Sequence, residues 1–138
     1  MIYGKLEYKS DDSLNQFIDQ SWNVYSKESI SDIHTEIVSE VYSIERSTEV
    51  LVAAAIVIKK EDNFWITRLS KTELSYEAIE LAVRMLADYL FQNGHDKVFC
   101  DGGINGRYEE QLFYNCGFVK VIDRIFVLEK KVFYTHNC

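Results

Sequence analysis

The chain has 138 residues, of which 47% are hydrophobic and 27% are charged. This balance is typical of one globular domain with a full hydrophobic core, and it excludes an intrinsically disordered chain. No apolar run reaches membrane length and the N-terminus is polar, so we expect a cytoplasmic protein without a signal peptide or membrane partner. Residues 1–138 are expected to form a single domain.

The net charge of −7 is concentrated in the first part of the chain, because residues 1–50 hold ten acids and four bases. This part would repel nucleic acid and anionic membranes, and it could attract a cationic partner or substrate. A solvated acidic helix face is the alternative interpretation. Cys100, Cys116 and Cys138 have no metal-type spacing, and the apolar run before Cys100 predicts a reduced thiol in the core.

The N-terminal part is predicted to contain a strand and then a helix. Residues Ile2 to Tyr8 alternate between apolar and polar, which predicts the strand. Five apolar side chains then recur at three- and four-residue spacing, as in an amphipathic helix: Leu14, Phe17, Ile18, Trp22 and Tyr25. Residues 26–31 are polar and predict a loop. Residues 32–41 fit either a second helix or the approach to a strand.

The middle of the chain predicts three consecutive strands at residues 41–46, 50–58 and 64–69. Turn signals lie between them, at 47–49 and 61–63, so the three strands should form an antiparallel meander. The middle strand is almost wholly apolar around Ala53, Ala54 and Ala55, which predicts burial on both faces.

The clearest helix follows, with one apolar face and an Asn93-Gly94 stop signal. Its apolar face comprises Ile79, Ala82, Val83, Leu86, Leu90 and Phe91. His95 lies in the turn and is expected to be solvated. The remaining predicted elements are a buried strand at 97–100, a short helix at 107–115, and closing strands at 118–122 and 125–128.

Residues 113–118 read Phe-Tyr-Asn-Cys-Gly-Phe, a tyrosine followed three residues later by Gly-Phe. With the element order, this motif resembles the GNAT superfamily of acyl-CoA N-acyltransferases. The resemblance covers most of the chain in element order and about the last third in residues. It implies an α/β (α+β) GNAT-like domain with a mixed, mostly antiparallel central sheet and helices on both faces.

The resemblance also implies a site in a gap between splayed strands. The pantetheine arm of acetyl-CoA would lie along exposed backbone at residues 67–70, with Cys100 and Asp101 across the gap. Tyr114 would protonate the departing thiolate, a role that suits a phenol because it stays protonated at neutral pH. Alternatively, Tyr114 is a packed aromatic residue. The residues expected to bind the cofactor are Leu69, Ser70, Lys71, Ser75, Tyr76, Glu77 and Tyr114.

One segment departs from the family pattern, which places a glycine loop before the long helix to hold the cofactor's pyrophosphate. Residues 72–80 read TELSYEAIE, without glycine and with three acids. A Cβ keeps backbone away from phosphate, and acids compete with an anionic ligand for the helix N-terminus. Lys71 is the nearby cation and Ser75 could cap the helix. We therefore expect a degenerate pyrophosphate site. The glycine-rich turn at 101–107 is a second phosphate candidate, against a plain flexible turn.

Amine acetylation needs a base, and Glu45 and Asp101 are the candidates because each lies on or at the end of a strand. Either could instead be a surface carboxylate. A nucleophile formed by Cys100 or Cys116 with His34 is a further alternative.

The leading hypothesis is an N-acetyltransferase that moves an acetyl group from acetyl-CoA to a primary amine, either a small molecule or a peptide. The alternative is a catalytically degenerate GNAT-fold protein that acts as a binding or regulatory module. A third hypothesis is a homodimer or assembly paired through a strand edge in residues 118–128.

Overall fold

The computed structural model describes residues 2–7, 22–26, 36–72, 76–101, 107–122 and 125–136. The strands are β1 (Ile2–Glu7), β2 (Trp22–Ser26), β3 (Glu36–Glu45), β4 (Thr48–Lys60), β5 (Asn63–Lys71), β6 (Lys97–Asp101), β7 (Val119–Ile122) and β8 (Ile125–Glu129). The helices are α2 (Tyr76–Gln92), α3 (Arg107–Asn115) and α4 (Lys130–His136).

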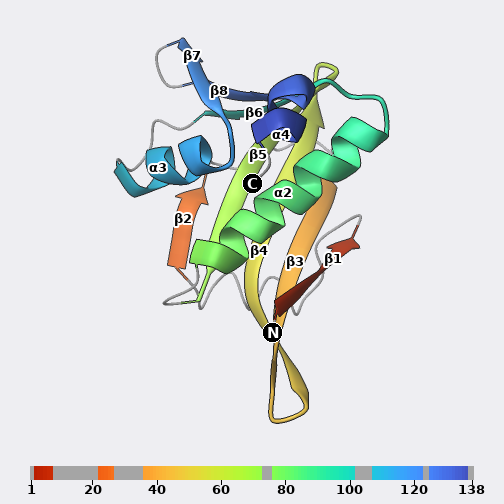
Figure 1. Ribbon diagram of the computed structural model, residues 1–138, viewed down its shortest axis with the longest axis vertical. Coiled ribbons are helices and arrows are strands. Elements are labelled where there is room, and N and C mark those ends of the chain that lie inside the picture. Colours follow the sequence, from red (N-terminus) through yellow and green to blue (C-terminus); the bar gives the residue numbers. More distant parts are fainter. Residues whose placement is uncertain are drawn as a thin grey trace.

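The strands form one mixed sheet in the order β1-β3-β4-β5-β6-β8-β7, and β2 pairs with β5 off this path (Figure 1). Only the β5–β6 pair is parallel among the described pairs. The predicted mixed, mostly antiparallel α/β sheet is therefore confirmed. A parallel pair needs a crossover connection, and α2 supplies it between β5 and β6.

Two tight turns build the predicted meander β3-β4-β5. Arg46 and Ser47 join β3 to β4, and Glu61 and Asp62 join β4 to β5; all four residues have positive φ. Two left-handed residues in succession give the hairpin a twist that matches the flanking strands. The strands run longer than predicted because the hydrogen-bonded ladder continues through polar residues to the turns. Residues 52–58 of β4 are all buried, as predicted.

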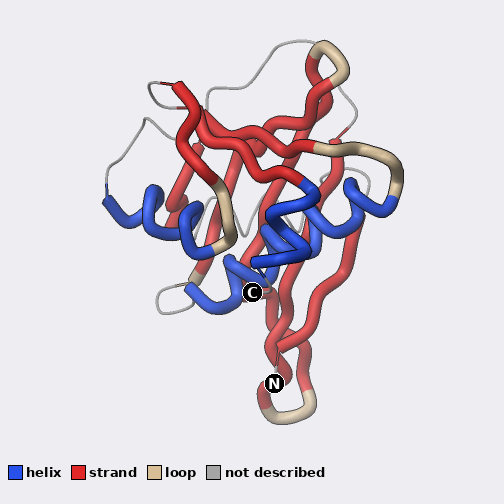
Figure 2. Tube along the Cα trace, turned by 45° about the horizontal axis from the view of Figure 1, so that its top comes forward, coloured by secondary structure: helices blue, strands red, loops and turns tan. Residues whose placement is uncertain are grey.

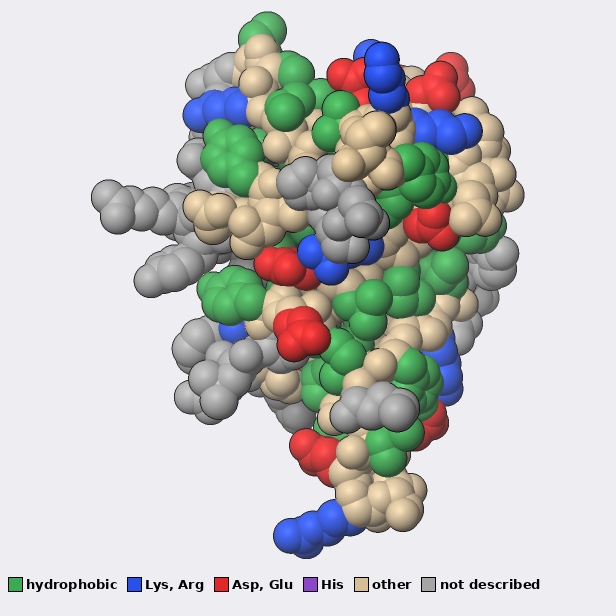
Figure 3. All heavy atoms as spheres, viewed as in Figure 1, with side chains coloured by type: hydrophobic (Ala, Val, Ile, Leu, Met, Phe, Trp, Pro, Cys, Tyr) green, Lys and Arg blue, Asp and Glu red, His purple; other side chains and the backbone are tan. Residues whose placement is uncertain are grey.

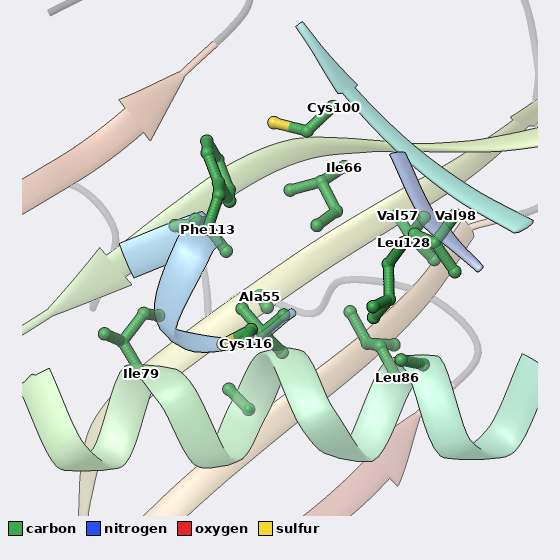
Figure 4. Close-up of a cluster of buried hydrophobic side chains, with 14 of the residues drawn as sticks. Ala55, Val57, Ile66, Ile79, Leu86, Val98, Cys100, Phe113, Cys116 and Leu128 are labelled. Atoms are coloured by element: carbon green, nitrogen blue, oxygen red, sulfur yellow. The ribbon is translucent and has the colours of Figure 1, made fainter. Parts of the chain in front are cut away.

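The main core lies between α2 and the sheet. Ile79 and Leu86 of α2 contribute to a cluster that includes Val57 of β4 and Ile66 of β5 (Figure 4). All six apolar α2 residues of the predicted stripe are buried. The helix ends at Gly94, which has a φ of 95°. The His95 N–H donates to the Leu90 carbonyl over 3.1 Å, and the Gly94 N–H donates to the Phe91 carbonyl over 3.3 Å. This pair of bonds is the Schellman cap that the Asn93-Gly94 signal predicts.

α2 crosses the front of the sheet, with α3 and α4 beside it (Figures 1 and 2). The opposite face is also buried at Val38, Ala54 and Ile56, which form a small second cluster. Residues 8–21, which hold most of the first predicted helix, lie outside the described residues. The end of that prediction is wrong: residues 22–26 form strand β2, because the edge of β5 offers them a backbone ladder.

Two other details differ from the sequence analysis. α4 was not predicted, and its Phe133 packs against Phe91 with ring centroids 5.4 Å apart. His95 is half-buried rather than solvated, because its ring packs edge-on against Phe64 at 4.7 Å. Among the described residues, no helix is both long and apolar enough to span a bilayer.

Candidate functional site

The predicted gap corresponds to the place where β5 and β6 part. Their last paired residues are Ile66 and Cys100. Beyond that pair, β5 continues to Lys71, whereas β6 ends at Asp101, which pairs with Ile125 of β8. The two parallel strands therefore diverge at the end of β6, and Asp101 stands at the point of divergence.

The edge of β5 beyond this point is covered by β2, which runs antiparallel to it. The paired residues are Trp22 with Lys71, Asn23 with Ser70, Tyr25 with Leu69 and Ser26 with Arg68. The expectation of exposed backbone at residues 67–70 is therefore corrected. On one edge β5 pairs with β4, and on the other it pairs first with β6 and then with β2.

The β5 side chains expected at the cofactor site are buried. Leu69 has 0% exposure and belongs to the main core. Ser70 and Lys71 are also fully buried. The Lys71 ammonium donates to the Thr72 carbonyl over 3.4 Å and lies 4.3 Å from the centre of the Tyr76 ring. A buried cation is favourable only with such partners, so the start of α2 helps to hold the charge at the end of β5.

The first turn of α2 carries the remaining predicted cofactor residues. Tyr76 and Glu77 are exposed, and Glu77 is the acid of this turn. Its carboxylate complements the positive end of the helix dipole and so competes with an anionic ligand there. Ser75 lies outside the described residues, as do residues 102–106 of the glycine-rich turn.

Tyr114 is the second-to-last residue of α3, and its neighbour Phe113 belongs to the core cluster that α3 shares with α2. Its side chain is 42% exposed, and its ring meets that of Phe126 edge-on at 5.5 Å. Phe126 pairs with Cys100, which is the last β6 residue paired with β5. A short series of contacts therefore connects Tyr114 to the divergence of β5 and β6. Among the described residues, none bonds to the Tyr114 hydroxyl.

The spacing of the Phe-Tyr-Asn-Cys-Gly-Phe motif has a folding explanation. Gly117 has a φ of 97°, and its N–H donates to the Tyr114 carbonyl over 3.0 Å. The Phe118 N–H donates to the Phe113 carbonyl over 2.9 Å, and the two rings lie 5.3 Å apart. These bonds and the ring contact form a Schellman cap with its usual apolar pair. The motif therefore ends α3 and aims the chain into β7, whether or not Tyr114 has a chemical role.

The other carboxylate candidate lies elsewhere. Glu45 is the last residue of β3, opposite Thr48, and it is exposed at the tip of the β3–β4 hairpin. β4 runs about 16 Å past Ala53, the partner of Lys71, to reach this tip. The hairpin projects away from α3 (Figure 1), so Glu45 and Tyr114 are not brought together.

A buried carboxylate that was not predicted lies further back on β3. Glu40 is only 6% exposed, and its carboxylate accepts a hydrogen bond from the Tyr42 hydroxyl over 3.2 Å. It pairs with Ala54 on the face opposite α2. An acid in the middle of the apolar run from Ile37 to Val41 was the signal in the sequence.

The remaining chemical candidates do not form a site in the described part of the chain. Cys100 and Cys116 are both buried thiols, as predicted for Cys100, and His34 lies outside the described residues. No group of three or more metal-ligating side chains occurs among the described residues. A hollow of about 530 Å³ lies between Lys97 and Tyr134, at the opposite end of β6 from Asp101.

β7 is a sheet edge with apolar side chains in solvent. Val119, Val121 and Ile122 are 46%, 55% and 68% exposed. Hydrophobic side chains gather over this strand at the top left of the space-filling view (Figure 3). This is the strand edge that the pairing hypothesis singled out.

Solved structures share this architecture. One is a domain from Methanocaldococcus jannaschii DSM 2661, with a TM-score of 0.67 and 16% identity over 94% of this chain and 99% of that one. Another is the ribosomal-protein-S18-alanine N-acetyltransferase of Escherichia coli, with a TM-score of 0.64 and 11% identity over 92% and 94%. The chain has the GNAT fold.

A third similar structure is the IAA acetyltransferase of Bacillus cereus ATCC 14579, with a TM-score of 0.54 and 9% identity over 92% and 99% of the two chains. No family model and no curated protein matches the sequence. The likeness is therefore one of backbone arrangement, with only 9% to 16% of the residues identical to those of these three structures.

Proposed function

We propose that this protein is a GNAT-fold N-acetyltransferase that moves an acetyl group from acetyl-CoA to a primary amine, either a small molecule or a peptide. The observation that carries this proposal is the position of Tyr114. An exposed phenol stands at the end of α3, and its ring packs on Phe126, across from the last β5–β6 pair at Cys100. Two of the similar folds belong to acetyltransferases.

The proposed reaction needs one side chain that donates a proton and one that accepts a proton. The attacking amine forms a bond to the acyl carbon as the carbon–sulfur bond breaks, and the departing thiolate needs a proton. Tyr114 would donate its hydroxyl proton at this step, because a phenol is neutral at pH 7 and its ring is held by packing. Asp101, at the divergence of β5 and β6, is the candidate to accept a proton from the incoming ammonium.

The test is turnover of acetyl-CoA with a panel of small amines and peptide N-termini. Tyr114→Phe should lower kcat by at least about 100-fold, which is the usual effect of losing a general acid. Tyr134→Phe is the matched control, because Tyr134 is 48% exposed on α4 and lies outside the proposed site. Equal activity in all three proteins would remove Tyr114 from the mechanism. No binding of acetyl-CoA at millimolar concentration would overturn the proposal itself.

A second candidate, a noncatalytic binding or regulatory module, is favoured by a specific observation. The backbone of β5 that an acyl-carrier arm would use is paired with β2, and the first turn of α2 presents Glu77 where a phosphate would bind. While β2 stays paired, this edge is therefore closed to acetyl-CoA. This function predicts that acetyl-CoA leaves the melting temperature unchanged, since a ligand that does not bind the native state cannot stabilise it.

A further inference from the structure

β2 and an acyl-carrier arm need the same backbone. Four residues of β2 pair with β5 between Arg68 and Lys71, on the edge that β6 leaves after Ile66. Each strand edge has one set of N–H and C=O groups, so a second extended partner with amide groups cannot bind there at the same time. The amides of a pantetheine arm make it such a partner.

β2 has the features of a strand that can be displaced. It contains only five residues, and its register with β5 is broken between Asn23 and Tyr25. Such a break leaves a residue unpaired and interrupts the ladder. β2 lies off the main strand path, and β5 is its single strand partner among the described elements. Short, interrupted edge elements open at the low end of the free-energy scale.

The sequence around β2 also favours a different conformation. Trp22 and Tyr25 continue the helical spacing that begins at Leu14, yet both residues lie in a strand. A conflict between the local pattern and the observed pairing marks a segment with two competing states. Backbone pairing with the edge of β5 favours the strand over the helix in this segment.

From this we propose that β2 is a displaceable internal competitor of the acyl donor. When β2 is paired with β5 the donor cannot bind, and when β2 is released the edge opens. This inference rests on the proposed function, because it assigns the donor to the same edge. The apparent Kd then equals the intrinsic Kd divided by the fraction of molecules in which β2 is released, so anything that releases β2 raises affinity.

A reversible lock tests the competition. Ser26→Cys with Arg68→Cys joins a facing pair, and facing residues in antiparallel strands have Cα atoms about 4.5–5.5 Å apart, within the range of a disulfide. The background carries Cys138→Ser, because Cys100 and Cys116 are buried. Ile2→Cys with Ser43→Cys is the matched control, because it locks the facing pair of β1 and β3 at the other side of the sheet.

Acetyl-CoA is the probe, because its sulfur is acylated and cannot exchange with the engineered disulfide. Its binding is measured by calorimetry before and after the disulfide is reduced with a phosphine. The oxidised β2 lock should lose binding, and reduction should restore it. The oxidised control should bind like the unmodified protein. Equal affinity of the oxidised and reduced β2 locks would overturn the inference while leaving the proposed function standing.

Release is tested by Trp22→Pro with Asn23→Pro. One of two adjacent strand residues directs its N–H to the neighbouring strand, so this pair of prolines removes at least one ladder bond. Acetyl-CoA affinity should rise by about tenfold, the effect of one or two lost backbone hydrogen bonds on the paired state. Hydrogen exchange should be faster at residues 68–71 in this variant and slow again on adding acetyl-CoA.

The two ways of failing are distinguishable. If the proline variant binds no more tightly than the unmodified protein while both bind measurably, β2 is not a competitor. If no form binds, including the proline variant with its exposed edge, the acetyl-CoA assignment is wrong. Faster hydrogen exchange at residues 68–71 in the proline variant would show that β2 had been released. Pairing of β2 with β5 would then not explain the absence of acetyl-CoA binding.

Discussion

The ends of α2 and α3 are built in the same way but present different side chains. Each helix ends in a Schellman cap on a glycine with positive φ, at Gly94 and at Gly117. The residue three positions before each glycine is aromatic in both. In α2 it is Phe91, which is fully buried, and in α3 it is Tyr114, which is 42% exposed. The glycine and its backbone bonds therefore belong to the cap. The exposed hydroxyl of Tyr114 is what remains to be explained by function.

The sharpest test of this comparison is truncation at the shared position. Phe91→Ala should lower the free energy of unfolding by about 3–5 kcal/mol, because a fully buried ring leaves a cavity. Tyr114→Ala should cost only about 1 kcal/mol, mainly its edge-on contact with Phe126. Urea denaturation of both variants measures the difference. Equal losses would mean that Tyr114 is a core residue and would weaken its role as a proton donor.

The caps themselves give the next largest effect. Gly94→Ala and Gly117→Ala should each cost about 1–2 kcal/mol, because an L side chain strains the left-handed conformation. A Cβ on Gly94 meets no heavy atom within 4 Å, so its loss is purely one of backbone conformation. Gly117 is buried, so its cost should be at least as large. Asparagine at either position should recover part of the loss, and unchanged stability in Gly94→Ala would argue against the cap.

The Gly94 cap was predicted from the sequence, as were the elements whose side-chain pattern agrees with their pairing. The α2 stripe, the meander and the α3 boundaries all follow from side-chain spacing and turn residues. β2 was not predicted, because the spacing of Trp22 and Tyr25 is that of a helix. Only pairing with the edge of β5 places this segment in a strand. α4 was missed for a similar reason, since its short apolar face depends on Phe91 for its packing.

The site was predictable only in part. The motif at residues 113–118 located Tyr114, because its spacing fixes the end of a helix. The turn after Glu45 was predicted, but its distance from the divergence of β5 and β6 depends on the register of β3, β4 and β5, which no local pattern gives. The apolar residues on either side of Glu40 were the local signal of its burial. Pairing of the β5 edge with β2 depends on residues distant in the chain, so no local pattern could reveal it.

The last helical residues of α2 and α3 extend the comparison. Asn115 donates from its amide to the Glu80 carboxylate over 3.3 Å and so ties α3 to α2, whereas Gln92 bonds to Asp88 on its own helix over 2.9 Å. We expect Asn115→Ala to cost about 0.5–1 kcal/mol and Gln92→Ala less, because only the first bond joins separate elements. Denaturation of Asn115→Ala, Glu80→Ala and the double variant should give a nonzero coupling. Additive losses would show that the bond contributes nothing to holding the two helices together.

The smallest expected effect on stability concerns the hydroxyl of Tyr134, which is exposed like Tyr114. The Tyr134 hydroxyl donates to the Asp88 carboxylate over 2.7 Å, and this hydrogen bond, followed by desolvation and the charge of Asp88, raises the pKa of Tyr134 above 10.0. A raised folded-state pKa means that the bond stabilises the fold fully below pH 10 and that this stabilisation is lost as pH rises through the folded pKa. The difference in urea midpoint between the unmodified protein and Tyr134→Phe should therefore be constant from pH 7 to 9 and shrink above pH 10. A difference independent of pH would show that Tyr134 contributes through packing against Phe91 and not through its hydroxyl.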